Sequence, residues 1–176
     1  MGTTLCNINL YNPEKKEYDP GEELYVAYIR DGWDTILEED DARDFDRISK
    51  LAATLSKSLN TTAIVTIYFD DDVFGLDVYS DGDVKAFYHN SYGETESEDT
   101  QSLVDAMDTD AASAKALHYL LDQDLMACDA VHKFSALSGL PFYLDKFMYD
   151  ESDGNYVPDK EQVLKELEIE SGENFT

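Results

Sequence analysis

Hydrophobic and polar positions alternate in several segments of the first half of the chain, which is the pattern of half-buried β-strands. The pattern predicts strands over residues 3–10, 24–30, 63–69, 73–80 and 83–89. The run AIVTIYF at residues 63–69 is apolar and β-branched, which favours the centre of a sheet. Asp81-Gly82 separates the last two strands and predicts a tight hairpin, because such a turn needs residues that tolerate positive φ. The first two strands are expected to pair across a long loop.

Apolar residues recur every three or four positions in the other segments, which is the spacing of amphipathic helices. Residues 41–59 carry one such stripe, made of Phe45, Ile48, Leu51, Leu55 and Leu59. Further helices are predicted over residues 103–107, 111–125, 128–137 and 160–168. Ile36 and Leu37 are expected to form a short helical turn.

This order of strands, one helix, a meander and then more helices predicts an α+β fold. We expect one domain over residues 1–176, with an antiparallel sheet of about five strands and helices packed mainly on one face. The length favours a single domain. A content of 43% hydrophobic and 12% aromatic residues supplies material for its core.

The charge is the most unusual feature of the composition. Thirteen Lys and Arg against 39 Asp and Glu give a net charge of −26 at pH 7. Nucleic acids and anionic membranes are therefore not expected as partners, because affinity for them depends on Lys and Arg that neutralise phosphates. A basic protein would instead be attracted and steered to the surface.

The two cysteines, Cys6 and Cys128, lie far apart and form no disulfide framework. The sequence has no run of about 18 apolar residues and no basic-then-apolar start, so we expect a cytoplasmic protein. Cys128 and His132 have the i, i+4 spacing of two ligands on one helix, but a zinc site would need further ligands. Cys128 is interpreted as a small buried hydrophobic residue.

Six aspartates fall within residues 69–83, which raises the question of a metal site. Asp70, Asp71 and Asp72 lie before one predicted strand, whereas Asp81 and Asp83 lie at its far end. A strand rises about 3.3 Å per residue, so the two groups are about 30 Å apart and cannot share one ion. A smaller Mg²⁺ or Ca²⁺ site at the first three remains an alternative, and a polar turn is the simpler interpretation.

No nucleophile elbow, dinucleotide-binding glycine motif or phosphate-binding loop occurs in the sequence. Carboxylates are too numerous for one acid–base pair to be singled out. We therefore expect no cofactor and name no catalytic residue.

Acidic turns with an aromatic anchor are the predicted binding surface. Residues 90–101 are expected to form a polar loop that carries Tyr92, and tyrosine buries area at interfaces while keeping a polar tip. The candidate partner-binding residues are Asp70, Asp71, Asp72, Tyr92, Glu94, Glu96, Glu98 and Asp99.

Trp33 and two segments, AIVTIYFDDDVFGLDVYSDGDVKAFY and FSALSGLPFYLDKFMY, together resemble small acidic bacterial proteins of unassigned function. In those proteins an apolar strand, an acidic turn, a second strand and an Asp-Gly hairpin precede a helix that ends in an LxGLP segment. Some of them resemble immunity proteins, which protect a cell from a toxin. The resemblance covers residues 33–149 and implies no particular functional residue.

The leading hypothesis is a non-enzymatic, acidic protein-binding module. It would act as an immunity-type inhibitor that occupies the phosphate-binding surface of a basic toxin or nuclease. One alternative is a metal-dependent enzyme that uses Asp70, Asp71 and Asp72. Another is a bacterial protein with a regulatory or structural role, in which the acidity serves only solubility.

Overall fold

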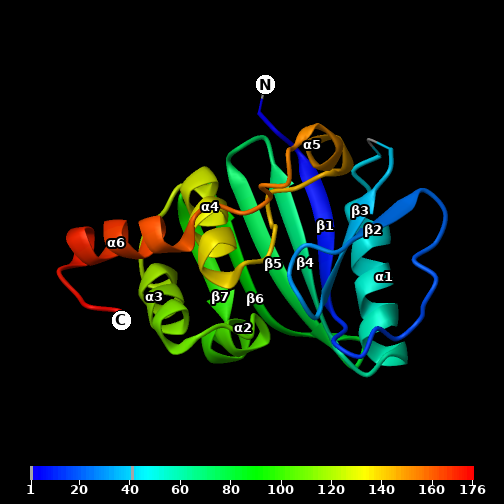
Figure 1. The fold of residues 1–176 in the computed structure, drawn as a ribbon, viewed down its shortest axis with the longest axis horizontal. Helices are drawn as coiled ribbons and strands as arrows, with labels where there is room; N and C mark the ends of the chain where they lie inside the picture. Colours follow the sequence, from blue (N-terminus) through cyan, green and yellow to red (C-terminus); the bar gives the residue numbers. More distant parts are fainter. Residues whose placement is uncertain (1, 41) are drawn as a thin grey trace.

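A seven-stranded antiparallel sheet organises the fold, which is α+β as predicted (Figure 1). The structure is a computed structural model that describes residues 2–40 and 42–176. Its strands are β1 Leu5–Tyr11, β2 Leu24–Ala27, β3 Trp33–Glu38, β4 Thr62–Phe69, β5 Val73–Ser80, β6 Asp83–Ser91 and β7 Glu94–Glu98. The helices in these residues are α1 Phe45–Ser58, α2 Thr100–Ala106, α3 Ala111–Leu121, α4 Ala127–Ser138, α5 Lys146–Glu151 and α6 Lys160–Ser171.

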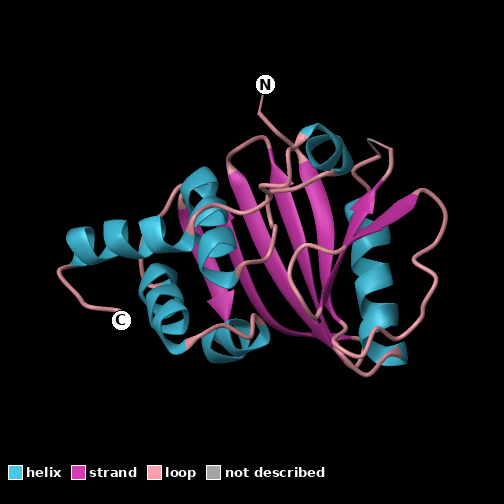
Figure 2. Cartoon of the chain, viewed as in Figure 1, coloured by secondary structure: helices cyan, strands magenta, loops and turns pink. Residues whose placement is uncertain are grey.

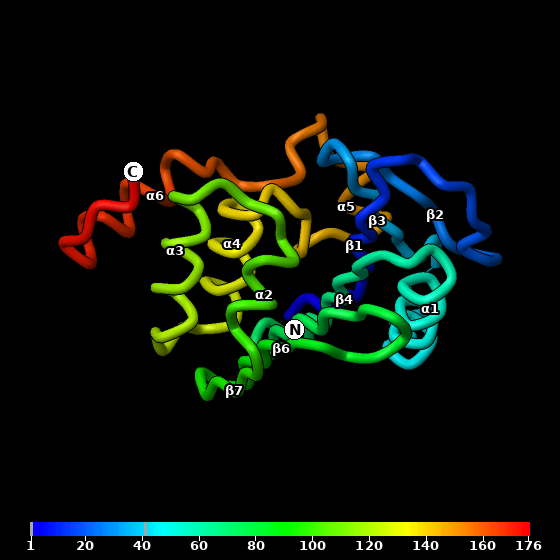
Figure 3. Tube along the Cα trace, turned by 90° about the horizontal axis from the view of Figure 1, so that it is seen from below, coloured from blue at the N-terminus to red at the C-terminus, as the bar shows by residue number. Residues whose placement is uncertain are grey.

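The strands lie in the order β2-β3-β1-β4-β5-β6-β7, so β2 and β7 form the two edges (Figure 2). Helix α1 covers one face, where it packs on Ile8, Leu10 and Val65. Helices α2, α3, α4 and α6 lie on the other face, over a core that includes Tyr68 and Tyr88. Figure 3 shows α1 on one side of the sheet and this group of helices on the other. The prediction that the helices pack mainly on one face is confirmed.

The sheet has two more strands than predicted, and β3 is the first of them. The helical turn expected at Ile36 and Leu37 is wrong, because both residues belong to this strand. Strand β3 pairs antiparallel with both β1 and β2, so the first two strands do not form the expected hairpin. All six residues of β3 are buried. A strand covered on both faces loses the hydrophobic–polar alternation that identifies strands in a sequence.

The second additional strand is β7, which lies within the polar loop expected at residues 90–101. All five of its residues are exposed, so it has no apolar face to reveal it. Charged edge strands are common because they discourage pairing with another chain. The Asp81-Gly82 hairpin is confirmed: it joins β5 to β6, and the two residues have φ of 52° and 84°.

All five predicted helices are present, and their ends differ from the predictions by a few residues. Helix α1 begins at Phe45, where the carboxylate of Asp44 accepts the N–H of Arg47 at 3.0 Å. The predicted start at Asp41 lies outside the described residues. Helix α5 was not predicted. In the described part of the chain, no helix is both long and apolar enough to cross a membrane.

A buried asparagine on the inner strand β1 fixes the connection between α4 and α5. The side-chain amide of Asn7 lies 3.1, 3.2 and 2.9 Å from the carbonyl oxygens of Pro141, Phe142 and Leu144, and donates to them. Asn7 is fully buried, and Pro141, Phe142 and Leu144 are buried too, so these bonds satisfy carbonyl groups in the interior. The connection therefore places Tyr143 at the end of the sheet.

Candidate functional site

Two turns meet at one end of the sheet. The β4–β5 turn carries Asp70, Asp71 and Asp72, and the β6–β7 turn carries Tyr92. Antiparallel pairing of β4 through β7 brings both turns to the same end, where the N–H of Tyr92 donates to the carbonyl of Asp72 at 2.8 Å. We call this region, made of Asp70, Asp71, Asp72, Tyr92 and Glu94, the acidic end.

The turn residues at the acidic end adopt an uncommon backbone conformation. The φ angles are 51° at Asp70, 64° at Asp71 and 53° at Tyr92. Aspartate tolerates this left-handed region better than most residues because its short side chain can bond to nearby backbone groups. The turns therefore present their side chains from a tight, hydrogen-bonded backbone.

Two of the three turn carboxylates hold the start of the described chain. Asp70 accepts the N–H of Gly2 at 2.8 Å, and Asp71 accepts the N–H of Thr3 at 3.1 Å. The described residues contain no group of three or more His, Cys, Asp or Glu side chains arranged to hold a metal ion. These bonds give Asp70 and Asp71 a structural role as acceptors for the backbone of residues 2 and 3.

The remaining candidate residues leave the acidic end along β7. Glu94, Glu96 and Glu98 share one face of the strand, opposite Ser91, His89 and Phe87 of β6. With a rise of about 3.3 Å per residue, Glu98 lies about 13 Å from Glu94. Asp99 follows as the cap of α2, where it accepts the N–H of Ser102 at 3.1 Å. Its bonds to the side chain and backbone of Ser102 lower the pKa of Asp99.

The predicted binding set is thus divided. Asp70, Asp71, Asp72, Tyr92 and Glu94 come together, whereas the last three acids of the set extend towards the opposite end of the sheet.

A cleft of about 640 Å³ lies beside the acidic end, between α4, the end of β4 and the loop after α5. Its walls include the rings of Tyr68, Tyr143 and Tyr156, and we call it the tyrosine cleft. The rings of Tyr68 and Tyr143 meet edge to face at 5.1 Å, and Tyr156 stacks on Tyr149 at 5.0 Å. These contacts fix the walls of the cleft without covering it.

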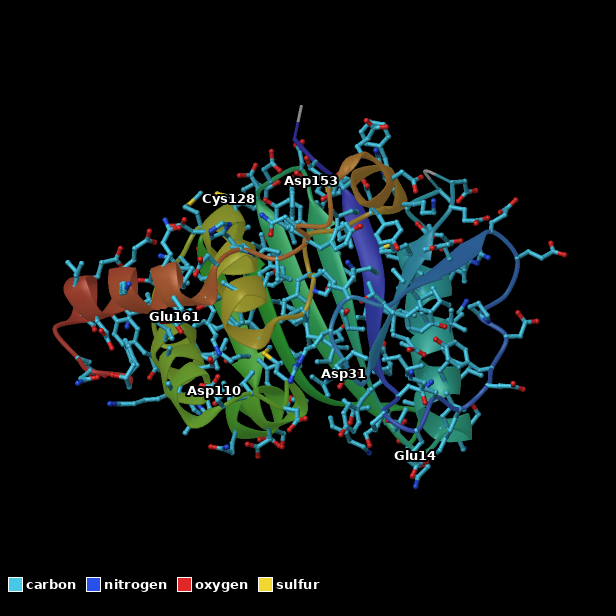
Figure 4. The ribbon with its side chains drawn as sticks, viewed as in Figure 1. Glu14, Asp31, Asp110, Cys128, Asp153 and Glu161 are labelled. Atoms are coloured by element: carbon cyan, nitrogen blue, oxygen red, sulfur yellow. The ribbon has the colours of Figure 1, made fainter. Side chains whose placement is uncertain are left out.

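Helix α4 contributes three polar side chains to this cleft: Cys128, His132 and Ser135. Cys128 is exposed, so its interpretation as a small buried residue is wrong. The reason is the orientation of α4. The helix buries its alanines, Val131 and Phe134 against the core, and it turns Cys128 and His132 towards the cleft. Figure 4 shows Cys128 at the end of the molecule where the β4–β5 turn lies.

Ser135 and Asp71 determine the polarity of the tyrosine cleft. Ser135 is only 2% exposed, and its hydroxyl has no hydrogen-bond partner among the described residues. Asp71 is the only Asp, Glu, Lys or Arg among the described residues that line the cleft, and His132 is the only histidine there. Burial first, and then the nearby Asp71 carboxylate, raise the pKa of Tyr68, so its hydroxyl stays protonated. The cleft therefore combines aromatic walls with a net negative charge.

A larger cleft of about 780 Å³ lies near the β2 edge and has a different character. Lys15 and Lys16 balance acidic side chains there, and Asp34 is only 5% exposed. The amide of Asn12 and the hydroxyl of Tyr18 both donate to Asp34, at 2.9 and 2.8 Å. The buried carboxylate of this cleft already has hydrogen-bond partners, whereas the buried hydroxyl of Ser135 in the tyrosine cleft has none among the described residues.

The second cysteine belongs to a third, smaller cleft of about 340 Å³. The thiol of Cys6 donates to Glu38 at 3.5 Å, and both residues are buried. Burial and the neighbouring Glu38 raise the pKa of Cys6 well above its usual range. The thiol therefore remains protonated and is a poor nucleophile.

Sequence reasoning found the acidic end but missed the tyrosine cleft. No local signal singles out Tyr143 or Tyr156, and none distinguishes Ser135 from other helical serines. No protein-family model matches the sequence, and comparisons with curated proteins and with solved structures gave no match. The geometry of the acidic end and its cleft must therefore carry the functional argument.

Proposed function

We propose that the protein is a non-enzymatic binding module for a basic protein, and that the acidic end is its docking surface. The observation that carries this proposal is the presence of exposed aromatic and acidic side chains on the same tightly bonded turns. In the immunity-type version of this function, the module covers the phosphate-binding surface of a toxin or nuclease.

Exposed hydrophobic side chains are concentrated at this end. Four of the eight large hydrophobic residues that are exposed in the described chain lie on or beside it: Phe69, Tyr92, Met126 and Tyr143. Phe69 directly precedes the β4–β5 turn, and the sulfur of Met126 lies beside Gly93 in the β6–β7 turn. Aromatic anchors surrounded by charged residues are typical of the residues that dominate binding energy.

The net charge of −26 supports a basic partner over any other class. Complementary charge speeds encounter and suppresses wrong partners, and like charge repels nucleic acid and anionic lipid. Both cysteines are free, which fits the reducing cytoplasm in which we place the protein.

The test compares the acidic end with a distant surface that has the same charge. The first variant combines Asp72→Asn, Glu94→Gln and Tyr92→Asn, and asparagine is chosen at position 92 because it tolerates positive φ. The matched control combines Glu170→Gln, Glu173→Gln and Ile169→Ala at the end of α6, where Ile169 is 83% exposed. Both variants lose two charges and one exposed hydrophobic side chain.

Binding to a panel of basic nuclease domains of pI above about 9 is measured by biolayer interferometry at ~20 and ~300 mM NaCl. We expect at least one domain to bind, with association slowing as salt rises and with affinity about thirtyfold weaker for the acidic-end variant. The control should stay near wild type. Equal losses in the two variants would show that charge acts without a docking surface and would contradict the proposal.

A further inference from the structure

We propose that the tyrosine cleft receives one arginine side chain of the basic partner. This inference rests on the proposed function and names the group that the docking surface recognises. The volume of about 640 Å³ lies within the ordinary range of about 300–1,000 Å³ for ligand pockets.

The unpartnered hydroxyl of Ser135 is the first observation that points to a ligand. A buried hydroxyl without a partner is unfavourable, and most such groups in folded proteins are satisfied. Ser135 is 2% exposed and lines the cleft, so a group that fills the cleft lies against the part of the wall in which this oxygen is buried. A donor from outside would complete the hydrogen bonding that the fold leaves open.

The charge of the cleft selects a cation. Asp71 lines it, and its described lining contains neither lysine nor arginine. Asp70 and Asp72 flank Asp71 in the same turn and add to the negative potential. None of the chain's own described Lys or Arg side chains lines the cleft, so a cation that binds there must come from another molecule.

The aromatic walls favour a guanidinium over an ammonium group. A cation within about 6 Å of a tyrosine ring is attracted by the face of the ring, and arginine also stacks because its head group is planar. Arginine carries five N–H donors, which can serve the Asp71 carboxylate and the Ser135 hydroxyl together. Lysine presents a compact, strongly hydrated charge that loses more on entering a cleft with aromatic walls.

The direct probe is the peptide N-acetyl-Gly-Arg-Gly-amide, and its citrulline analogue is the matched control because citrulline has the same shape without the charge. Titrations followed by ¹H–¹⁵N NMR should give saturable shifts at Tyr68, His132 and Ser135. We expect the arginine peptide to bind about tenfold or more tightly than the citrulline peptide, and more tightly than its lysine counterpart. Equal binding of the arginine and citrulline peptides would overturn the inference.

The exposed thiol of Cys128 allows the cleft to be blocked after the protein has folded. N-ethylmaleimide should modify Cys128 on the folded protein and spare the buried Cys6. Binding of the arginine peptide should then be lost, whereas a Cys128→Ser variant treated in the same way should still bind. If the modified protein binds the peptide unchanged, the cleft is not its site and the inference fails.

Ser135→Ala separates recognition from folding. Removing an unpartnered hydroxyl should leave the melting temperature unchanged or higher, while arginine-peptide affinity falls about threefold or more. A variant that melts lower without losing peptide affinity would show a structural role for Ser135 and contradict the inference.

The nuclease panel distinguishes failure of the arginine-binding inference from failure of the proposed function. If a basic domain binds the maleimide-modified and unmodified proteins equally, but binds the acidic-end variant weakly, the cleft inference fails and the proposed function stands. If no basic domain binds either protein, the proposed function itself fails.

Discussion

Strands β1 and β7 belong to the same antiparallel sheet but have opposite surroundings. In β1 the first six residues are all buried, and in β7 all five residues are exposed. Both strands form backbone hydrogen bonds with a neighbour, so these bonds do not explain the contrast. The difference shows that packing on the faces of the sheet, rather than its hydrogen-bonding pattern, determines where stability is concentrated.

The inner strands β1 and β4 and the outer strands β6 and β7 therefore differ in how their faces are packed. Around β1 and β4 the faces are filled by α1 on one side and by the connection after α4 on the other. On the outer strands, His89 and Glu96 lie on the same face as α1 but remain exposed, because α1 packs on β1, β4 and β5. Both faces are therefore packed around β1 and β4, whereas β6 and β7 are packed on one face only and leave the other face, with the turns at their end, free to display charge.

The largest expected effect is the loss of Asn7 from the inner strand β1. Asn7→Ala removes the donor to three buried carbonyls, and we expect the free energy of unfolding to fall by about 3 kcal/mol. Chemical denaturation measures this change. The matched control is Asn155→Ala, because Asn155 is exposed. A loss below about 1 kcal/mol for Asn7→Ala would mean that water or a rearranged loop replaces the side-chain amide.

A smaller loss of stability is expected when valine is replaced by alanine on an inner and on an outer strand. Val65→Ala on β4 removes a fully buried side chain, and we expect unfolding to become easier by about 2 kcal/mol. Val84→Ala on β6 removes a side chain that is 45% exposed, and the change should stay within about 0.5 kcal/mol. Paired urea denaturation curves test the difference. Equal losses would remove the distinction between the inner and the outer strands.

The same contrast explains how far the sequence could predict the fold. The Asp81-Gly82 hairpin, the apolar strand β4 and the α1 stripe depend on local patterns, and all three are confirmed. Strands β3 and β7 were missed because one is buried on both faces and the other is exposed on both. A pattern method detects alternation, so it fails for strands at these two extremes.

The candidate site was predictable only in part, for a related reason. The acids and Tyr92 could be named from their turn-like sequence, and the predicted β5–β6 hairpin is what brings Tyr92 next to Asp72. The course of the other glutamates depends on β7, which no pattern revealed. The orientation of α4 on the sheet buries the Ser135 hydroxyl without a partner and leaves Cys128 exposed. Sequence spacing placed them on one helix without showing which side faces the core.

The smallest effect concerns the pair formed by His89 on β6 and Asp77 on β5. The Nε2 of His89 lies 2.7 Å from Asp77, and this hydrogen bond is the main reason why the pKa of His89 is raised, although partial burial opposes it. Gly75 lies opposite His89 in the β5–β6 pairing, and a Cβ there would come within 3.2 Å of the imidazole. The glycine therefore leaves room for the ring to reach Asp77.

A histidine whose pKa is higher in the folded state stabilises the fold most when it is protonated. The contribution of His89 is thus fully present below the ordinary value of about 6.5 and is lost as pH rises through the raised pKa. Its side chain is 47% exposed, so solvent limits the effect to a few tenths of a kcal/mol, about the value of an exposed pair. Asp77→Asn should lower the His89 pKa in an NMR titration, with the resonances of the other two histidines as internal references. It should also destabilise the protein more at pH about 5.5 than at pH about 8.5. An Asp77→Asn penalty that is the same at both pH values would show that the pair contributes as a neutral hydrogen bond, and this part of the sheet would then lack even this small electrostatic support.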